Sequence, residues 1–164
     1  MRLLPKGLGH RRQVDKAGGL RRSGDAAGAI DLLAPVLLAE PENTPANVEM
    51  ARSLHLLGDL AGSEEHYRRA IREELDYHLV VELAGVVGAA GRIKEAEELL
   101  GAALQMTEAE KGLDPGEALL VSAALAAGQG RTKRARKILD EIDAGESGPG
   151  VREYAAKMRE RLPI

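Results

Sequence analysis

The sequence predicts an all-α protein built from repeated helical hairpins, and two observations carry this prediction. A segment that begins at Gly24 aligns with segments that begin at Gly58, Gly91 and Gly130, at spacings of 34, 33 and 39 residues. A period of this length made of two helices is typical of helical solenoids, because one helix pair cannot bury its own apolar face. The 164 residues also include no Phe, no Trp and three Tyr, so the core must be mainly aliphatic, which suits closely packed helices.

The length and charge of the chain predict its domain organisation. A chain of 164 residues can bury the core of one domain and is too short for two ordinary domains. The net charge is −3, but residues 1–24 hold seven Arg or Lys against one Asp. We therefore expect an irregular basic arm over residues 1–9, a repeat domain over residues 10–147 and a capping helix over residues 148–164. For the arm, a solvated terminus is favoured over a contact with an acidic protein surface, nucleic acid or anionic lipid.

The first repeat is expected to form helices over residues 10–22 and 25–39. Gly18 and Gly19 lie in the middle of the first helix, and together they cost about 1–2 kcal/mol relative to alanine. This helix should therefore be the least stable one unless another element packs on it. Pro35 removes one backbone donor from the second helix and should bend it.

The second repeat begins with Thr44 and Pro45, which mark the start of a helix over residues 44–57. The threonine hydroxyl can accept a hydrogen bond from a free amide of the first turn, and proline at the first helical position loses no needed donor. The next helix is expected to start at Asp59 or Ser63.

The fifth expected helix, over residues 77–90 with Asp76 as its cap, contains a glycine-rich segment. Glycines at this density can suggest a phosphate-binding loop, but no strand precedes them and no Gly-Lys-Ser/Thr follows. Because a spacing of three residues places Gly85 and Gly88 on one helical face, we expect a helix of a neighbour or a ligand to pack closely there.

The last part of the chain is expected to contain four more helices and a capping box. The expected elements are a helix over residues 93–106, a connection over 107–114, a helix over 115–127, a helix that begins at 131, a break over 146–150 and a final helix over 151–162. Asp114 and Glu117 should form the box at the start of the seventh helix. The basic start of the eighth helix should pair with glutamates of the sixth and with Asp140 and Glu141, which is favoured over a site for an acidic ligand.

Each turn glycine is followed by two positions that hold the same kind of residue in every repeat. A small residue follows the glycine by five positions, and a large apolar residue comes four positions later. The small residues are Ala29, Ser63, Ala96 and Ala135, and the large residues are Leu33, Tyr67, Leu100 and Leu139. Over about residues 11–147 this pattern resembles the tetratricopeptide repeat family. The resemblance implies a right-handed solenoid of about four helical hairpins with a capping helix at its C-terminal end.

No motif in the sequence predicts catalysis or metal binding. The absence of cysteine excludes disulfides and thiolate sites, and none of the four histidines is spaced to share a metal with another. His66 is expected to be exposed. The serines lie in no nucleophile-elbow pattern. We therefore expect no enzyme activity, no cofactor and no metal. Because the first residues lack a secretory core and no apolar run has the length of a membrane span, a cytoplasmic location is the simplest expectation.

The resemblance also implies a binding groove, because in similar proteins the first helix of each hairpin lines a concave surface that receives a peptide or helix. The residues assigned to this groove are Arg21, Arg22, Glu49, Arg52, His55, Leu56, His78, Val81, Glu82, Gly85, Gly88, Leu120, Val121 and Ala124. One end of the set is polar and partly basic, and the other is apolar and small. A helix with an apolar stripe could lie against the small residues, while its acidic residue meets Arg52 or Arg22. Packing within the core is the alternative for each apolar position.

These features predict an adaptor or assembly factor that binds a segment of a protein partner without catalysis. A substrate-specific chaperone resembling those of type III secretion is the first alternative. The second is a homo-oligomeric scaffold that associates through the Gly/Ala face or the final helix. Binding of nucleic acid through the basic arm is the least favoured, and it would show a steep dependence on salt.

Overall fold

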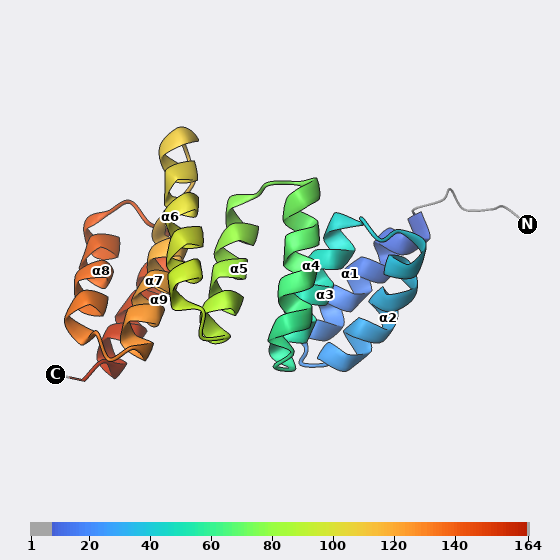
Figure 1. Ribbon diagram of the computed structural model, residues 1–164, viewed down its shortest axis with the longest axis horizontal. Helices are drawn as coiled ribbons and strands as arrows, with labels where there is room; N and C mark the ends of the chain where they lie inside the picture. Colours follow the sequence, from blue (N-terminus) through green and yellow to red (C-terminus); the bar gives the residue numbers. More distant parts are fainter. Residues whose placement is uncertain (1–7, 164) are drawn as a thin grey trace, which may run out of the picture. The chain divides into compact units, whose positions relative to one another are not determined.

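The computed structural model describes residues 8–163, and within them it is all-α, as predicted (Figure 1). Its helices are α1 (Leu8–Arg22), α2 (Ala26–Ala39), α3 (Thr44–Leu56), α4 (Leu60–Glu73), α5 (Tyr77–Ala89), α6 (Ile93–Ala109), α7 (Gly116–Gly128), α8 (Thr132–Ala144) and α9 (Pro149–Arg161). The expectation of an irregular arm over residues 1–9 is wrong for residues 8 and 9, which form the first turn of α1. Residues 1–7 of that arm lie outside the described residues.

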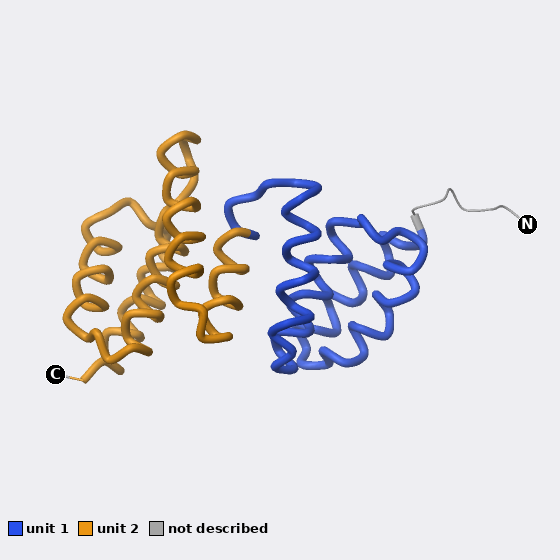
Figure 2. Tube along the Cα trace, viewed as in Figure 1, with its two compact units in different colours: residues 1–79 blue, residues 80–164 orange. Residues whose placement is uncertain are grey.

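The helices form two compact units, Met1–Leu79 and Val80–Ile164 (Figure 2). In the first unit α1 packs on α2, α2 on α3 and α3 on α4. In the second unit α6 packs on α7, α7 on α8, and α9 packs on both α7 and α8. Consecutive helices are thus paired as tetratricopeptide-like hairpins, with α9 as an additional final helix.

The four repeat glycines form the same turn four times. Gly24, Gly58, Gly91 and Gly130 all have positive φ, at 95°, 82°, 83° and 70°. The amide after each glycine donates to a carbonyl five residues earlier, as in the bonds from Asp25 N to Leu20 O at 2.9 Å and from Arg92 N to Val87 O at 3.1 Å. This closure of a helix C-terminus requires a left-handed residue, which glycine adopts without steric cost. The sequence repeat is therefore a repeat of turn geometry.

Short polar side chains cap the N-termini of α2, α3 and α4. Asp25 accepts a hydrogen bond from Gly28 N at 2.8 Å, and Asp59 accepts one from Gly62 N at 2.9 Å. The expectation that Thr44 caps α3 is wrong by one residue. Asn43 has the extended backbone of a cap and accepts from Ala46 N at 3.0 Å, so Thr44 already belongs to the helix.

The sixth helix runs three residues beyond its expected end at 106. The amide of Glu110 still donates to Met106 O at 2.9 Å, and the hydroxyl of Thr107 donates to Leu104 O at 2.7 Å. These bonds continue the helical ladder over residues that the sequence analysis assigned to a connection. The connection to α7 is therefore shorter than expected.

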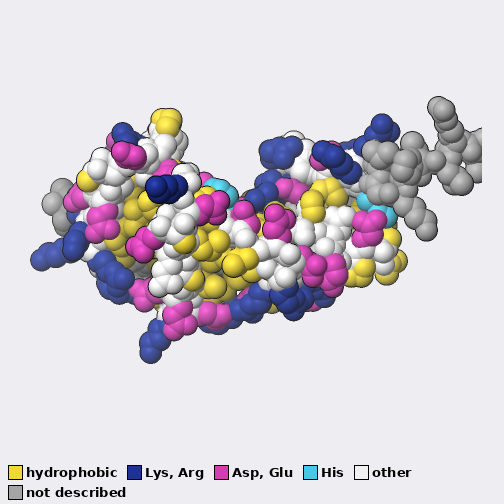
Figure 3. Space-filling model, turned by 90° about the horizontal axis from the view of Figure 1, so that it is seen from above, with side chains coloured by type: hydrophobic (Ala, Val, Ile, Leu, Met, Phe, Trp, Pro, Cys, Tyr) yellow, Lys and Arg dark blue, Asp and Glu magenta, His cyan; other side chains and the backbone are white. Residues whose placement is uncertain are grey.

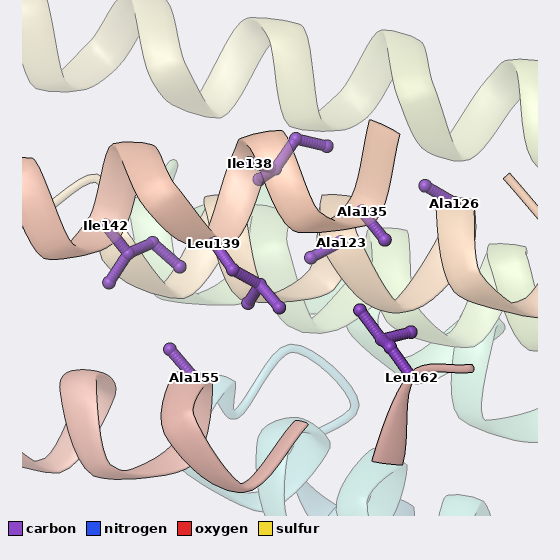
Figure 4. Close-up of a cluster of buried hydrophobic side chains, with 8 residues drawn as sticks. All are labelled: Ala123, Ala126, Ala135, Ile138, Leu139, Ile142, Ala155 and Leu162. Atoms are coloured by element: carbon purple, nitrogen blue, oxygen red, sulfur yellow. The ribbon is translucent and has the colours of Figure 1, made fainter. Parts of the chain in front are cut away.

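The repeated small and large positions form the core of the hairpins. All four small residues are fully buried, and the large residues Leu33, Tyr67, Leu100 and Leu139 are at most 2% exposed. In the second unit Leu139 and Ile142 of α8 pack with alanines of α7 and with Ala155 and Leu162, as Figure 4 shows. This packing covers one side of the α7–α8 hairpin with α9, as the sequence analysis expected of the final helix.

Candidate functional site

The second unit contains a groove of about 700 Å³, which we call the apolar groove. Its walls come from α5, the start of α6, α7 and α9. The lining residues are Val81, Glu82, Gly85, Gly88, Ala89, Ile93, Glu117, Leu120, Val121, Ala124, Leu125, Gly128, Gln129, Tyr154 and Met158. A volume of this size is typical of ligand-binding clefts in proteins.

The helical period explains which residues of α5 and α7 line this groove. Lining residues of α5 recur from Val81 to Gly85 and Ala89, and those of α7 recur from Glu117 to Gly128 at steps of three or four residues. Gly85 leaves a hollow, because no heavy atom lies within 4 Å of the place where its β-carbon would be. At Gly88, one turn further on, that place is taken by the side chain of Leu125.

The structure brings seven of the residues predicted for the partner surface together in the apolar groove. They are Val81, Glu82, Gly85, Gly88, Leu120, Val121 and Ala124. Two of them also serve packing, since Val81 is 4% exposed and Gly88 is covered by Leu125. The sequence analysis missed the contributions of α6 and α9. Tyr154 and Met158 were expected only in the stripe of the capping helix, yet both also line the groove.

Charge is distributed unevenly along the apolar groove. The charged residues of its lining are Glu82 and Glu117, and both are acidic. Glu117 lies in the first turn of α7, and Glu82 lies near the middle of α5. In Figure 3, apolar side chains gather over the C-terminal unit, with both acidic and basic side chains beside them.

The first unit contains a different pocket, of about 630 Å³, which we call the charged pocket. It is lined by Val14, Asp15, Gly18, Arg22, Thr44, Pro45, Val48, Glu49, Arg52, Glu74, Asp76 and Leu79. Glu49 lies between two arginines, with Oε2 at 2.8 Å from Arg21 Nε and Oε1 at 3.1 Å from Arg52 Nη1. Burial alone would raise the pKa of the Glu49 carboxyl, but the hydrogen bonds and charges of Arg21 and Arg52 outweigh burial and lower it.

Gly18 allows this ion cluster to form against α1. A β-carbon at position 18 would lie 3.1 Å from Arg22 Nη1 and 3.2 Å from Glu49 Oε2. Gly18, which weakens α1 as an isolated helix, thus lets the Glu49 side chain of α3 approach the backbone of α1. Packing on α2 and α3 supplies the support that the sequence analysis required for this helix.

Four residues assigned to the partner surface line neither the apolar groove nor the charged pocket: Arg21, which pairs with Glu49, and His55, Leu56 and His78. His55 and Leu56 are exposed at the end of α3, where Leu56 keeps 62% of its accessible surface. His78 is exposed in the first turn of α5, and its ring meets that of Tyr77 edge to face at 5.1 Å.

His66 is half-buried, which corrects the expectation that it is exposed. Its Nδ1 lies 2.8 Å from the side-chain oxygen of Asn47, a residue that is 1% exposed. The Asn47 amide nitrogen donates to Pro41 O and Asn43 O, so the oxygen is left to accept from His66. Burial is the main cause that lowers the pKa of His66, and the positive charge of Arg69 lowers it further.

Asp114 joins the α6–α7 connection to the turn before α9. Its carboxylate accepts hydrogen bonds from Gly116 N at 2.8 Å, Ser147 Oγ at 2.9 Å and Gly148 N at 2.8 Å. Burial would raise the pKa of Asp114, but these three bonds and the positive charge of Arg152 outweigh burial and lower it. At the start of α7, Pro115 makes no side-chain cap bond, and Asp114 accepts from the Gly116 amide two residues ahead.

The basic start of α8 is paired with α6, as expected. Arg131 Nη2 lies 3.1 Å and Arg134 Nη1 3.4 Å from Glu97 Oε1. The expected role of Asp140 is wrong, because its carboxylate lies 3.0 Å from Arg159 of α9 instead.

Within residues 8–163 no group of three or more histidines and acidic residues is arranged to hold a metal ion. No helix in the same range combines the length and apolarity needed to cross a membrane.

Comparisons with known proteins agree with this architecture. A family model described as "Tetratricopeptide repeat" matches residues 20–85. Cellulose synthase operon protein C of Xanthomonas axonopodis pv. citri (strain 306) is 31% identical over 150 residues, which are 91% of this chain. The chain spans only 9% of that relative.

Two solved structures share the fold. PilW, a widely conserved type IV pilus biogenesis factor, aligns with a TM-score of 0.70 at 20% identity, over 84% of this chain and 62% of PilW. A kinesin light chain from Podosopora anserina with nearly identical TPR-like repeats aligns with a TM-score of 0.71 at 19% identity, over 93% of this chain and 84% of its own. The family model identifies tetratricopeptide repeats over residues 20–85, and the repeated turns and hairpin packing extend the same fold to the described residues beyond them.

Proposed function

We propose that this protein is an interaction module, an adaptor or assembly factor, that binds an apolar segment of a partner protein in the apolar groove. The hollow over Gly85 is the observation that carries the proposal. A glycine inside a helix lowers its stability relative to alanine, and here no neighbouring side chain uses the space it leaves. Leu120 and Val121 of α7 and Tyr154 of α9 line the same groove and would contribute apolar surface to a bound partner segment.

The comparisons support an interaction module over an enzyme. Tetratricopeptide repeats generally mediate protein–protein interaction, and one similar structure is that of a pilus biogenesis factor. The proposal therefore includes no catalytic residue and no cofactor. It retains a cytoplasmic location and a protein partner, as expected from the sequence.

Affinity capture from a lysate of the source organism tests this proposal. The bait is the full chain, compared with Gly85→Leu, which fills the hollow. Gly101→Leu is the matched control, because Gly101 is an exposed glycine of α6 with equally open space and lies outside the groove. We expect one stoichiometric partner to be retained by the wild type and by Gly101→Leu and lost from Gly85→Leu. Retention by all three baits contradicts the assignment of the groove.

Self-assembly is a second candidate, favoured by large apolar side chains exposed on the first unit. Leu38 is 86% exposed, Leu75 69% and Leu56 62%. Analytical ultracentrifugation over a range of concentrations tests it. A monomer at every concentration contradicts it, while a dimer that is lost on Leu38→Glu supports it.

A further inference from the structure

We propose that the start of α8 forms a second interaction surface, which binds a short run of Asp and Glu in a partner protein. We call it the basic surface, and its cations are Arg131, Lys133, Arg134, Arg136 and Lys137. The described lining of the apolar groove includes none of them, so the inference goes beyond the proposed function. It commits to an acidic protein segment, and binding of nucleic acid or of a second copy of this chain would overturn it.

Four of these cations surround one recess at the start of α8. The recess has a volume of about 690 Å³ and is lined by Gly130, Arg131, Thr132, Lys133, Arg134 and Arg136. Lys137 follows Lys133 by one turn, so the two lysines lie on the same face of the helix. Both lysines and Arg134 are exposed, whereas Leu139 and Ile142 on the other side of α8 are buried (Figure 4).

The chain neutralises only part of this positive charge. Arg131 and Arg134 share one carboxylate oxygen, Glu97 Oε1, at 3.1 Å and 3.4 Å. Arg136 donates to two backbone carbonyl oxygens that follow α9, at 3.2 Å and 3.1 Å, and these carry no net charge. One carboxylate is therefore the ion-pair partner of two of the five cations.

The two lysines lack the partners that the sequence analysis expected for them. Asp140 pairs with Arg159 instead. Among the residues that the structure describes, neither Lys133 nor Lys137 has a hydrogen-bond or ion-pair partner. Glu141 follows Lys137 by one turn, but an exposed pair at this spacing contributes little and would not withhold the lysine from a partner.

Helix stability does not explain basic residues at this position. The helix dipole favours acidic side chains at an N-terminus, but the first turn of α8 contains none. By contrast, α2 and α4 begin with the aspartates Asp25 and Asp59. Lys133, in the first turn of α8, opposes the dipole without an ion pair in return, and an acidic partner would supply the missing negative charge.

The extent of the basic surface favours a short acidic segment over a nucleic acid. Its cations span about 9 Å along α8, and Asp140 and Glu141 follow on the same helix. A nucleic acid continues with regularly spaced phosphates, which these carboxylates would repel. The sequence of α8 also contains no aromatic residue on which a base could stack.

Binding of two fluorescent peptides to the full chain tests this inference. One peptide contains a run of glutamates, and in the other glutamine replaces each of them. By fluorescence anisotropy at low salt we expect the glutamate peptide to bind with a Kd below about 1 mM, and its affinity should fall as the salt concentration rises. The glutamine peptide should not bind.

Double variants of the chain locate the effect. Lys133→Glu with Lys137→Glu should weaken binding of the glutamate peptide by about tenfold or more, because both unpaired cations become repulsive. The paired Gln replacements should weaken it by about threefold. Lys16→Glu with Lys111→Glu is the matched control, since it makes the same change in net charge at two exposed lysines outside the basic surface, and it should change the affinity less than about twofold. Circular dichroism should show equal helicity, because glutamate at the start of α8 agrees with the dipole.

The outcomes are distinct from those of the test of the apolar groove. Gly85→Leu should leave the affinity for the glutamate peptide unchanged, and a loss of binding would place the peptide in the groove and overturn the inference. Equal affinities of the wild type and Lys133→Glu with Lys137→Glu, or equal weakening by the control, also overturn it. An oligonucleotide of the same charge that binds tighter than the glutamate peptide would identify a nucleic-acid surface instead. Dimers of the chain that exclude the glutamate peptide would identify a second copy as the occupant and likewise overturn the inference.

Discussion

Leu125 of α7 lies directly over Gly88 of α5 and fills the place where a β-carbon at position 88 would be. Gly85 lies on the same face one turn earlier, and its corresponding place is empty to at least 4 Å. Two glycines on one face of the same helix therefore have different roles. Gly88 allows α5 and α7 to pack closely, and Gly85 leaves the groove open between them.

This contrast predicts opposite effects of alanine at the two positions. Gly85→Ala should raise the free energy of unfolding by up to about 1 kcal/mol, because alanine favours the helix and meets no neighbour. Gly88→Ala should lower it by about 1–2 kcal/mol, because Leu125 must move and the packing of α7 with it. Urea denaturation followed by circular dichroism measures both. Equal stabilisation by the two substitutions would contradict the close packing of Leu125 on Gly88.

Asp114→Ala should loosen α9, since it removes the acceptor of three hydrogen bonds. We expect a loss of about 1–3 kcal/mol in the free energy of unfolding and faster amide hydrogen exchange in α9. Because the folded state lowers the pKa of Asp114, its contribution is present above the ordinary pKa of 3.8 and is lost as the pH falls through the lower folded value. The difference between wild type and variant should therefore shrink in acid. Glu108→Ala, at an exposed position of α6, is the control and should change little.

Local chemistry made the helices and turns predictable from the sequence. The left-handed turn glycines, the aspartate caps at Asp25 and Asp59, and the buried small and large positions all depend on residues close together in the chain. The resemblance to tetratricopeptide repeats likewise assigned Gly85 and Leu120 to the partner surface, and both line the apolar groove. Errors of one to three residues occurred at helix ends, as at Asn43, where two adjacent residues could both act as caps.

Contacts between distant residues were not predictable in this way. Ser147 meets Asp114 from 33 residues away, and the sequence around either residue describes only an ordinary turn. Tyr154 and Met158 fit the stripe of a capping helix, and only the packing of α9 on α7 shows that both also face the groove. His66 was misjudged because its acceptor, Asn47, belongs to the preceding helix.

Glu49→Gln should destabilise the first unit more than loss of a surface ion pair does. The Glu49 side chain is 13% exposed and its partner Arg21 18%, so the substitution leaves two arginines without their shared charge in a partly dry site. We expect a loss of about 1–3 kcal/mol in the free energy of unfolding. Glu153→Gln is the control, because Glu153 pairs with Lys157 at 2.6 Å but both are more than 60% exposed, and it should cost less than about 0.5 kcal/mol. If Glu49→Gln and Glu153→Gln lower the free energy of unfolding by similar amounts, burial does not strengthen the ion pairs of Glu49.

The half-buried His66 should make the stability of the protein depend on pH near neutrality. The folded state lowers its pKa below the ordinary value of 6.5, so the unfolded chain binds the proton more readily. Wild-type stability should therefore fall as the pH drops from 7 through 6.5 and should level off below the folded pKa. His66→Gln should be less stable at pH 7, because Asn47 loses its ring donor, and should lack this slope. His55→Gln, at an exposed position of α3, should keep the wild-type slope. Urea denaturation at a series of pH values distinguishes the three proteins, and a slope that survives in His66→Gln would assign the titration to another group.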